Sequence, residues 1–314
     1  MTTTATDLVA FGEDSIAKGS KSFGMAAKLF RPEVRGDVVM LYAWCRHADD
    51  LIDGQEFGFG QEADHREGQS ERLVELKAKT ARALAGETVD DPAFDVLVEV
   101  TRNNEIPARH PQELIDGFEM DVNERSYVTL GDTLDYCYHV AGVVGVMMAM
   151  VMGARSPRVL DRASDLGLAF QLTNIARDIV DDARVGRRYV PSELLVRHGL
   201  TEANYAAPEN RAALYAVACD LLEAAEAYYA SARWGVPALD WRSAWAIAAA
   251  GRVYRAIGSK LRRAGPPAWD ERISTGTLTK IGLVVLALGD VIVSRFRREE
   301  NGPDRTGLYI RPTG

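Results

Sequence analysis

Helical spacing of apolar residues is the feature of this chain that most constrains its fold. Over 72–84 and 211–231, Ala, Leu, Glu and Arg recur at intervals of three and four residues. The alternating pattern of a half-buried strand is nearly absent. Turn formers separate the helical runs at 54–68, 106–111, 206–209, 235–237 and 265–267. The sequence therefore predicts an all-α protein.

The domain organisation predicted from sequence is simple. No shift in composition and no repeat of solenoid period marks a second domain. We expect one helical domain over 1–298. Residues 299–314 contain turn formers without an apolar stripe, which predicts a flexible C-terminal tail. A chain of 314 residues, 47% of them hydrophobic, can bury a sizeable core without disulfides.

Charge and cysteine usage exclude several classes of function. The formal charge of -8 argues against a nucleic-acid-binding protein with a broad basic face. Three cysteines without CxxC spacing, and an N-terminus unlike a signal peptide, predict the cytoplasm. The apolar runs 140–153 and 281–293 are shorter than the ~20 residues of a membrane-spanning helix. We expect buried core helices there, with peripheral contact at the inner membrane as the alternative.

Two acidic clusters lie within otherwise apolar helical segments. Over 38–53, helical spacing puts four polar residues on one face: Tyr42, Arg46, Asp49 and Asp53. Over 165–182, a second polar stripe runs beside an apolar one: Gln171, Asn174, Asp178 and Asp182. The clusters read Asp-Asp-x-x-Asp and Asp-x-x-Asp-Asp, so they are near mirror images. A single acidic pair, such as Asp90 and Asp91, is expected to be solvated surface.

The two clusters point to cation sites. Carboxylates one turn apart repel one another unless a cation compensates them. Hard oxygen ligands without His or Cys select Mg2+, or Mn2+ as the alternative, and Mg2+ commonly adds phosphate oxygens of a substrate. A diphosphate is the ligand that this chemistry implies.

Basic and small residues adjoin the clusters. The guanidinium group of arginine can bind phosphate oxygens in a planar, two-pronged geometry, but for each arginine near the clusters a salt bridge to a nearby aspartate is an equal alternative. The arginines concerned are Arg46, Arg177, Arg184, Arg187 and Arg188. Ser20, Lys21 and Ser22 could form either a phosphate site or a helix cap. Gly142 and Gly145 would permit close approach of either a ligand or another helix.

These segments together resemble the squalene and phytoene synthase family, the head-to-head isoprenoid synthases. The matching stretches are GSKSF (19–23), LYAWCRHADDLID (41–53), DGFEMDV (116–122), YCYHVAGVVG (136–145), LGLAFQLTNIARDIVDDARVGRRYVP (166–191) and VYRAIG (253–258). The resemblance implies a single-domain isoprenoid-synthase helical fold with a central active-site cavity. It is nearest to the members of bacterial carotenoid pathways.

The resemblance also implies the roles of individual residues. The implied Mg2+ ligands are Asp49, Asp53, Asn174, Asp178 and Asp182, with Asp50 and Asp181 flanking them. The residues implied to contact diphosphate or the nearby prenyl chain are Ser20, Lys21, Ser22, Tyr42, Arg46, Tyr136, Gln171, Arg177 and Tyr254. Arg272 and Lys280 are weaker candidates for the phosphate site. Arg46 and Tyr136 join the four aspartates as the residues expected to be catalytic.

The activity implied is the Mg2+-dependent condensation of two geranylgeranyl diphosphates to phytoene, through a cyclopropylcarbinyl diphosphate and without NADPH. A squalene or dehydrosqualene synthase using farnesyl diphosphate would share every acidic residue. A helical assembly factor without activity is the alternative from another class, and retention of both clusters argues against it. Further partners implied are other carotenoid-pathway enzymes.

Overall fold

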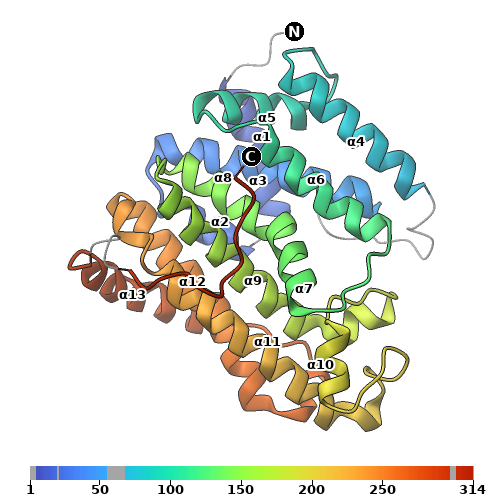
Figure 1. The fold of residues 1–314 in the computed structure, drawn as a ribbon. Helices are drawn as coiled ribbons and strands as arrows, with labels where there is room; N and C mark the ends of the chain where they lie inside the picture. Colours follow the sequence, from blue (N-terminus) through green and yellow to red (C-terminus); the bar gives the residue numbers. More distant parts are fainter. Residues whose placement is uncertain (1–4, 20, 55–67, 298–301, 314) are drawn as a thin grey trace. The chain divides into compact units, whose positions relative to one another are not determined.

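The computed structural model describes residues 5–19, 21–54, 68–297 and 302–313, without the side chains of 5 and 21–23. The described part contains helices and turns but no strand, which confirms the all-α class (Figure 1). The chain divides into two compact units, 1–123 with 146–155, and 124–145 with 156–314. The single domain expected over 1–298 stays a prediction.

The first unit is built around α3 (Pro32–Asp53). Pro32 occupies the first helical turn, where its missing N–H costs nothing, and Gly54 ends the helix with φ of 62°. The other helices of this unit are α1 (Ala5–Gly19), α2 (Lys21–Ala27), α4 (Gln69–Leu84), α5 (Pro92–Asn103) and α6 (Arg109–Val122), together with most of α8 (Val143–Val151). Helices α1 and α5 pack against α3, so Leu41 and Trp44 are fully buried.

Asp91 has a structural role that the sequence did not indicate. Its carboxylate caps α5 by accepting a hydrogen bond of 3.0 Å from the backbone N–H of Ala93. It also lies 3.1 Å from Nε2 of His47 on α3. The expectation of a solvated surface carboxylate is therefore wrong for Asp91, because the residue joins two helices.

We expect Asp91→Ala to lower the free energy of unfolding by about 1 kcal/mol at pH 7 through loss of the cap. Burial raises the pKa of Asp91, but His47, the N–H of Ala93 and Lys79 outweigh it and hold the pKa below its ordinary value. The stabilisation is thus present above the ordinary pKa and is lost as pH falls through the lower, folded value. Urea titrations at pH 7 and pH 3 should show that the difference in free energy of unfolding between Asp91→Ala and wild type is smaller at pH 3. The same difference at both pH values would contradict a stabilising role for the charged carboxylate.

The second unit is built around α9 (Pro157–Arg184), a 28-residue helix that packs against α11 (Arg211–Ala232) and α12 (Trp241–Ala264) (Figure 1). Its remaining elements are α7 (Leu130–Cys137), the π-helix η1 (Tyr138–Gly142), α10 (Ser192–Arg197), α13 (Thr277–Ser294) and the 3-10 turns η2 (Pro208–Asn210), η3 (Val236–Ala238) and η4 (Pro266–Trp269). The runs expected over 72–84 and 211–231 correspond to α4 and α11. Both helices end within one residue of the predicted position.

Glycines allow α9 to approach η1 and the start of α8 at backbone distance. A Cβ at Gly167 would lie 2.3 Å from the carbonyl oxygen of Ala141, and one at Gly145 would lie 2.5 Å from that of Ala163. A side chain in either position would therefore collide with backbone. Of the two alternatives for the glycines of 142–145, the structure favours close helix packing.

We expect Gly167→Ala to lower the free energy of unfolding by about 2 kcal/mol, because backbone atoms must move apart to admit the methyl group. Gly282→Ala on α13 is the matched control, since nothing lies within 4 Å of a Cβ there. That control should leave the free energy of unfolding unchanged or raise it, because alanine has a higher helix propensity than glycine. Equal urea midpoints for both variants would contradict the proposed close contact.

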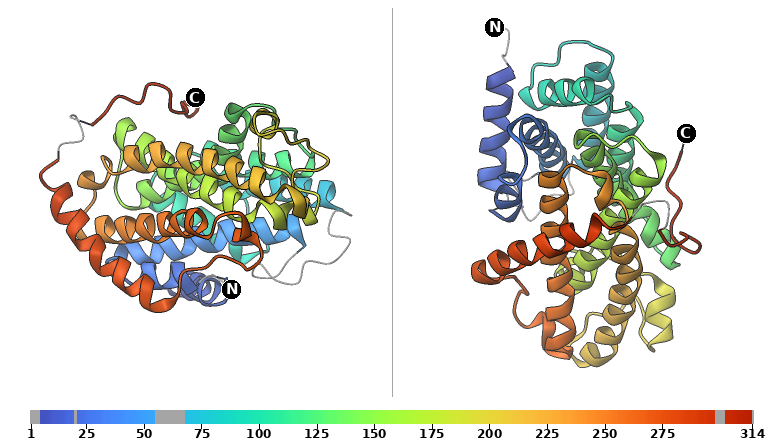
Figure 2. Two further views of the ribbon diagram at one scale, coloured as in Figure 1. Left: turned by 90° about the horizontal axis from the view of Figure 1, so that it is seen from below. Right: turned by 90° about the vertical axis from the view of Figure 1, so that its left-hand side faces the viewer.

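The two apolar runs have different environments. Among the residues that the structure describes, two helical segments are long and apolar enough to cross a membrane, Leu130–Val151 and Thr277–Ser294. The first is mostly buried, as expected of a core helix. In α13, by contrast, only 17% of the apolar window is buried, because the helix packs on α12 through one side that includes Ala287 and Val291 (Figure 2). The expectation of a buried core helix over 281–293 is therefore wrong.

The end of the chain also differs from the flexible tail expected over 299–314. Within it, the described residues 302–313 form an extended segment with specific contacts to the rest of the second unit. Arg305 donates two hydrogen bonds to Asp165 of α9, at 3.0 and 2.7 Å, and Arg311 donates to Asp161 at 2.6 Å. Asp165 is fully buried. The segment is attached because its arginines neutralise carboxylates that α9 holds out of water.

Candidate functional site

The acidic face of α3 is arranged around one arginine. Nη1 of Arg46 lies 2.7 Å from Oδ2 of Asp49 and 3.8 Å from Oδ1 of Asp50. Burial opposes the charge of Arg46, but Asp49, Tyr42 and Asp50 outweigh it and raise the pKa of the guanidinium. Asp49 and Asp53 are half-buried, whereas Asp50 is buried. The structure thus brings Tyr42, Arg46 and Asp49 together, and Asp53 follows one turn after Asp49 on the same helix.

The end of α1 lies against this face. A Cβ at Gly19 would meet the hydroxyl of Tyr42 at 2.7 Å and Nε of Arg46 at 3.8 Å. Gly19 directly precedes the predicted phosphate-binding residues. Ser20 lies outside the described residues, as do the side chains of Lys21 and Ser22, whose backbone begins α2. The close approach of Gly19 puts the start of this segment beside Tyr42 and Arg46.

The C-terminal end of α3 is held by a residue that sequence reasoning missed. Nη2 of Arg72 on α4 donates to the carbonyl of Ile52 at 3.2 Å. A positive group there interacts favourably with the helix dipole. This hydrogen bond anchors the last turn of α3, which carries Asp53. No spacing within the sequence connects Arg72 to that turn.

The second acidic stripe, on α9, contains the same kind of pair. Arg177 donates from Nε and Nη2 to the two carboxylate oxygens of Asp178, at 2.7 and 2.5 Å. Burial opposes the charge of Arg177, but Asp178, Tyr254 and Asp182 raise its pKa. Nδ2 of Asn174 donates to Oε1 of Gln171 at 3.4 Å. The predicted residues of this stripe share one partly exposed face.

The arginines at the end of α9 and in the loop after it differ in their roles. Arg184 pairs with Asp181 at 2.6 Å on the exposed surface. Arg188 pairs with Glu202 at 2.8 Å and donates to the carbonyls of Tyr127 and Val190. For these two, the salt-bridge alternative describes the structure. Arg184 pairs within the last turn of α9, whereas Arg188 holds the loop that follows the helix.

Tyr136 belongs to an aromatic cluster in the second unit. Its ring stacks on Tyr189 at 4.6 Å and meets Tyr127 edge-on at 5.5 Å. Tyr127 and Tyr189 were not among the predicted residues, because aromatic residues in turns carry no periodic signal. The cluster fixes the ring of Tyr136 in a buried position.

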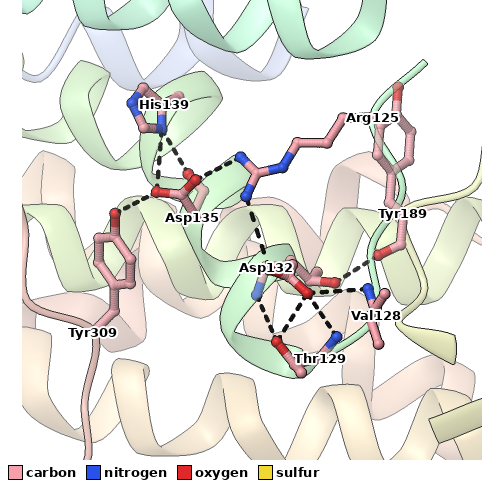
Figure 3. A network of polar contacts seen from close by, with 9 residues as sticks. Arg125, Val128, Thr129, Asp132, Asp135, His139, Tyr189 and Tyr309 are labelled. Atoms are coloured by element: carbon pink, nitrogen blue, oxygen red, sulfur yellow. Dashed lines mark hydrogen bonds and ion pairs between the residues drawn. The ribbon is translucent and has the colours of Figure 1, made fainter. Parts of the chain in front are cut away.

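A polar network holds the helix that carries Tyr136 (Figure 3). The carboxylate of Asp135 accepts hydrogen bonds from Arg125 at 2.6 Å and from the hydroxyl of Tyr309 at 2.8 Å. At the start of α7, Thr129 and Asp132 form a reciprocal capping box. The extended C-terminal segment therefore contributes directly to positioning α7 and Tyr136.

The remaining predicted residues are less closely connected. Tyr254 stacks on Phe170 at 4.1 Å, which fixes its ring beside α9. Arg272 is exposed in the loop before α13, and Lys280 is half-buried in the first turns of that helix. The structure does not bring Arg272 to the acidic stripe of α9 through any hydrogen bond or ion pair among the described residues.

The donor chemistry of the two stripes fits a hard divalent cation. Asp49 and Asp53 on α3, and Asn174, Asp178 and Asp182 on α9, supply only oxygen donors at intervals of about one turn. Arg46 and Arg177 each neutralise one carboxylate of a stripe. In the described part of the chain, no three His, Cys, Asp or Glu side chains converge on one point. The fit therefore rests on donor type and spacing.

Comparison with known proteins agrees with these observations. The family model described as squalene/phytoene synthase matches residues 16–279. The chain is 53% identical to a phytoene synthase of Pseudescherichia vulneris, over 95% of this chain and 96% of that protein. It is 53% identical to a 15-cis-phytoene synthase of a Paracoccus species, over 98% of both chains.

A solved structure supports the fold. The crystal structure of a dehydrosqualene synthase in complex with a ligand superposes with a TM-score of 0.82 and 26% sequence identity, covering 92% of this chain and 98% of that one. This neighbour and the two acidic stripes agree with the family match. Because it has the two acidic helices and matches known members over nearly its whole length, the chain belongs to the squalene/phytoene synthase family.

Proposed function

We propose that this protein is a 15-cis-phytoene synthase, which joins two geranylgeranyl diphosphates head to head and releases both diphosphates. The structural observation that carries this proposal is the ion pair within each acidic stripe, Arg46 with Asp49 and Arg177 with Asp178. Support for the product comes from curated relatives at 51 to 53% identity that are named phytoene synthases.

The reaction has two stages. In the first, one diphosphate leaves, and C1 of the resulting allylic cation is attacked by a double bond of the second substrate. Loss of a proton from C1 of that substrate then closes the ring and gives a cyclopropylcarbinyl diphosphate. In the second, the remaining diphosphate leaves, the ring rearranges, and loss of a proton gives the central triene. Each stage requires stabilisation of the negative charge on a leaving diphosphate.

Family members use prenyl diphosphates and generally depend on a metal; we propose Mg2+ for this chain. Asp49, Asp53, Asn174, Asp178 and Asp182 would hold it. Bound Mg2+ would supply charge stabilisation worth several kcal/mol to the departing diphosphate. Mn2+ is the alternative, because the same oxygen donors suit both ions.

The other side chains have separate tasks. Arg46 and Arg177 offer guanidinium donors that can exchange their carboxylate partners for phosphate oxygens. The ring of Tyr136, buried between Tyr189 and Tyr127, can stabilise an adjacent cation by ~0.5 to 2 kcal/mol. Burial of these rings excludes the water that would quench a carbocation.

The test is to incubate the full chain with geranylgeranyl diphosphate and Mg2+, without NADPH, and to identify the hydrocarbon by chromatography and mass spectrometry. A C40 triene that disappears with EDTA would support both the product and the metal dependence. No hydrocarbon from any prenyl diphosphate would overturn the proposal.

A second candidate is a dehydrosqualene synthase, which the solved structure with a TM-score of 0.82 favours. Such an enzyme would use farnesyl diphosphate and form a C30 product. Farnesyl diphosphate in a parallel incubation separates the two. A C30 product alone would keep the chemistry and replace the substrate.

We propose a cytoplasmic location with peripheral contact at the inner membrane, and contact there with other carotenoid-pathway enzymes. Support for membrane contact is the apolar surface of α13 and of the turn after it, where Leu278 and Ile281 on the helix and Phe296 in the turn are exposed. Basic residues Arg295 and Arg297 follow this helix and would add positive charge near anionic headgroups, although Arg295 also donates to the carbonyls of Pro237 and Leu239. Co-sedimentation with phosphatidylglycerol vesicles should be weakened by Leu278→Glu with Phe296→Glu; unchanged binding would overturn the assignment to α13.

A further inference from the structure

A cavity of about 750 Å³ lies in the second unit, lined by α9, α11, α12, α13 and η3. Its size falls within the roughly 300 to 1,000 Å³ of small-molecule sites. The apolar part of its wall comes from residues of all five elements: Leu166, Leu222, Val236, Ile247 and Leu283. Such a wall accommodates an apolar chain.

The cavity is separate from the acidic stripe of α9. Leu166 and Thr173, which line it, are seven residues apart and share one helix face. Gln171 and Asp178 are also seven residues apart, but they lie roughly on the opposite side, because two residues along a helix rotate by about 200°. Neither of them lines the cavity. A ligand here would therefore not contact the stripe.

The lining has an excess of positive charge. It contains five arginines and two carboxylates. Arg252 pairs with Asp290, and Arg255 donates to both carboxylate oxygens of Glu226 at 2.9 and 2.8 Å. These pairs use both carboxylates of the lining. Further positive charge is left at Arg233 and Arg297.

Arg233 is the unusual member of this group. It makes no hydrogen bond or ion pair with another residue in the described part of the chain. Burial, followed by the charges of Arg255 and Arg297, holds the pKa of its guanidinium below the ordinary value, although Asp290 and Glu226 act in the opposite direction. An anion beside Arg233 would relieve this unfavourable potential. Arg297 lies over the ring of Trp234, 5.3 Å from its centroid, and would add a second donor.

We propose that this cavity binds one anionic amphiphile, with a phosphate or diphosphate headgroup at Arg233 and Arg297 and a long apolar chain along the wall of α11, α12 and α13. Two sources share this chemistry. One is a soluble prenyl diphosphate, and the other is an anionic phospholipid in a bilayer. The site goes beyond the proposed catalytic reaction and does not depend on it.

Two variants test the two halves of the site. Arg233→Gln removes the unpaired charge and keeps the length of a polar side chain. Gly251→Leu fills the apolar part: a Cβ at Gly251 meets only Leu166, at 3.9 Å, so a larger side chain grows into the cavity without a backbone collision. Arg263→Gln is the matched control, because Arg263 is exposed on the same helix and does not line the cavity.

Binding is measured on the full chain in EDTA, which removes metal-dependent binding at the acidic stripes. Geranylgeranyl diphosphate is titrated by calorimetry, and vesicles of phosphatidylglycerol or phosphatidylcholine are tested by co-sedimentation. We expect Arg233→Gln and Gly251→Leu to weaken binding of the occupying ligand by about tenfold or more, as for loss of a charged hydrogen bond, with Arg263→Gln unchanged. If the variants lose binding only to geranylgeranyl diphosphate, the occupant is a soluble prenyl diphosphate. If they lose binding only to phosphatidylglycerol vesicles, the occupant is a bilayer phospholipid.

Wild-type affinity of both variants for both ligands would overturn the proposal, as would the absence of binding to wild type. Hydrocarbon formation with Mg2+ provides the independent readout. If Arg233→Gln and Gly251→Leu lose binding in EDTA but keep near-normal turnover at saturating substrate, the cavity is a site separate from the catalytic one. Turnover lost in parallel with binding would assign the cavity to the catalytic site and overturn its separateness.

Discussion

Asp178→Asn is expected to lower hydrocarbon formation by about a hundredfold or more while leaving the fold nearly intact. The carboxylate of Asp178 holds Arg177 through two hydrogen bonds and is a predicted metal ligand. An amide of the same shape lacks the charge needed for either task, and loss of metal charge stabilisation affects the leaving diphosphate directly. Product is measured with saturating Mg2+, and folding by circular dichroism and urea titration.

The matched control for this variant is Asp181→Asn. Asp181 lies three residues further along α9, is well exposed and pairs only with Arg184 among the described residues. We expect it to retain most of the activity, because a surface ion pair contributes about 0 to 1 kcal/mol. Near-normal turnover of Asp178→Asn would refute a metal-binding role for the stripe of α9.

Arg305→Ala is expected to lower the free energy of unfolding by about 3 kcal/mol, since it leaves the fully buried Asp165 without its cationic partner. The pKa of Arg305 is raised by Asp165 and Asp161, which outweigh its own burial. The stabilising charge is therefore present throughout the physiological pH range. The midpoint of urea unfolding provides the measurement.

A second substitution identifies the cause. Adding Asp165→Asn to Arg305→Ala should recover part of the lost stability, because the uncompensated buried charge is then removed. Arg263→Ala, at an exposed position on α12, should change the midpoint little. If Arg305→Ala unfolds at the wild-type midpoint, the C-terminal segment does not stabilise the second unit.

The sequence predicted the elements of the site well because helical spacing is local. Tyr42, Arg46, Asp49 and Asp53 share one face of α3, and Gln171, Asn174, Asp178 and Asp182 share one face of α9. Their neighbours in sequence are also their neighbours in space. Spacing alone does not say which aspartate pairs with Arg46 or with Arg177; in the structure these partners are Asp49 and Asp178.

Predictions that depended on distant neighbours were less accurate. The run 281–293 has the composition of a core helix, yet α13 is buried along one side only. Asp91 has the appearance of a surface residue, yet it caps α5 and contacts His47. In both cases the outcome depends on which other helix packs nearby, and the local pattern carries no signal of that.

By itself, the sequence determined the helical class, the family and the two acidic stripes, because the 3.6-residue period and side-chain chemistry are properties of short segments. Only the tertiary structure decided that residues 302–313 are attached to α9, and that the ring of Tyr136 packs against Tyr127 and Tyr189. It also decided that Arg233 borders a cavity. These outcomes required buried charges and rings to find partners far away in the chain, and such pairing is fixed by packing rather than by spacing.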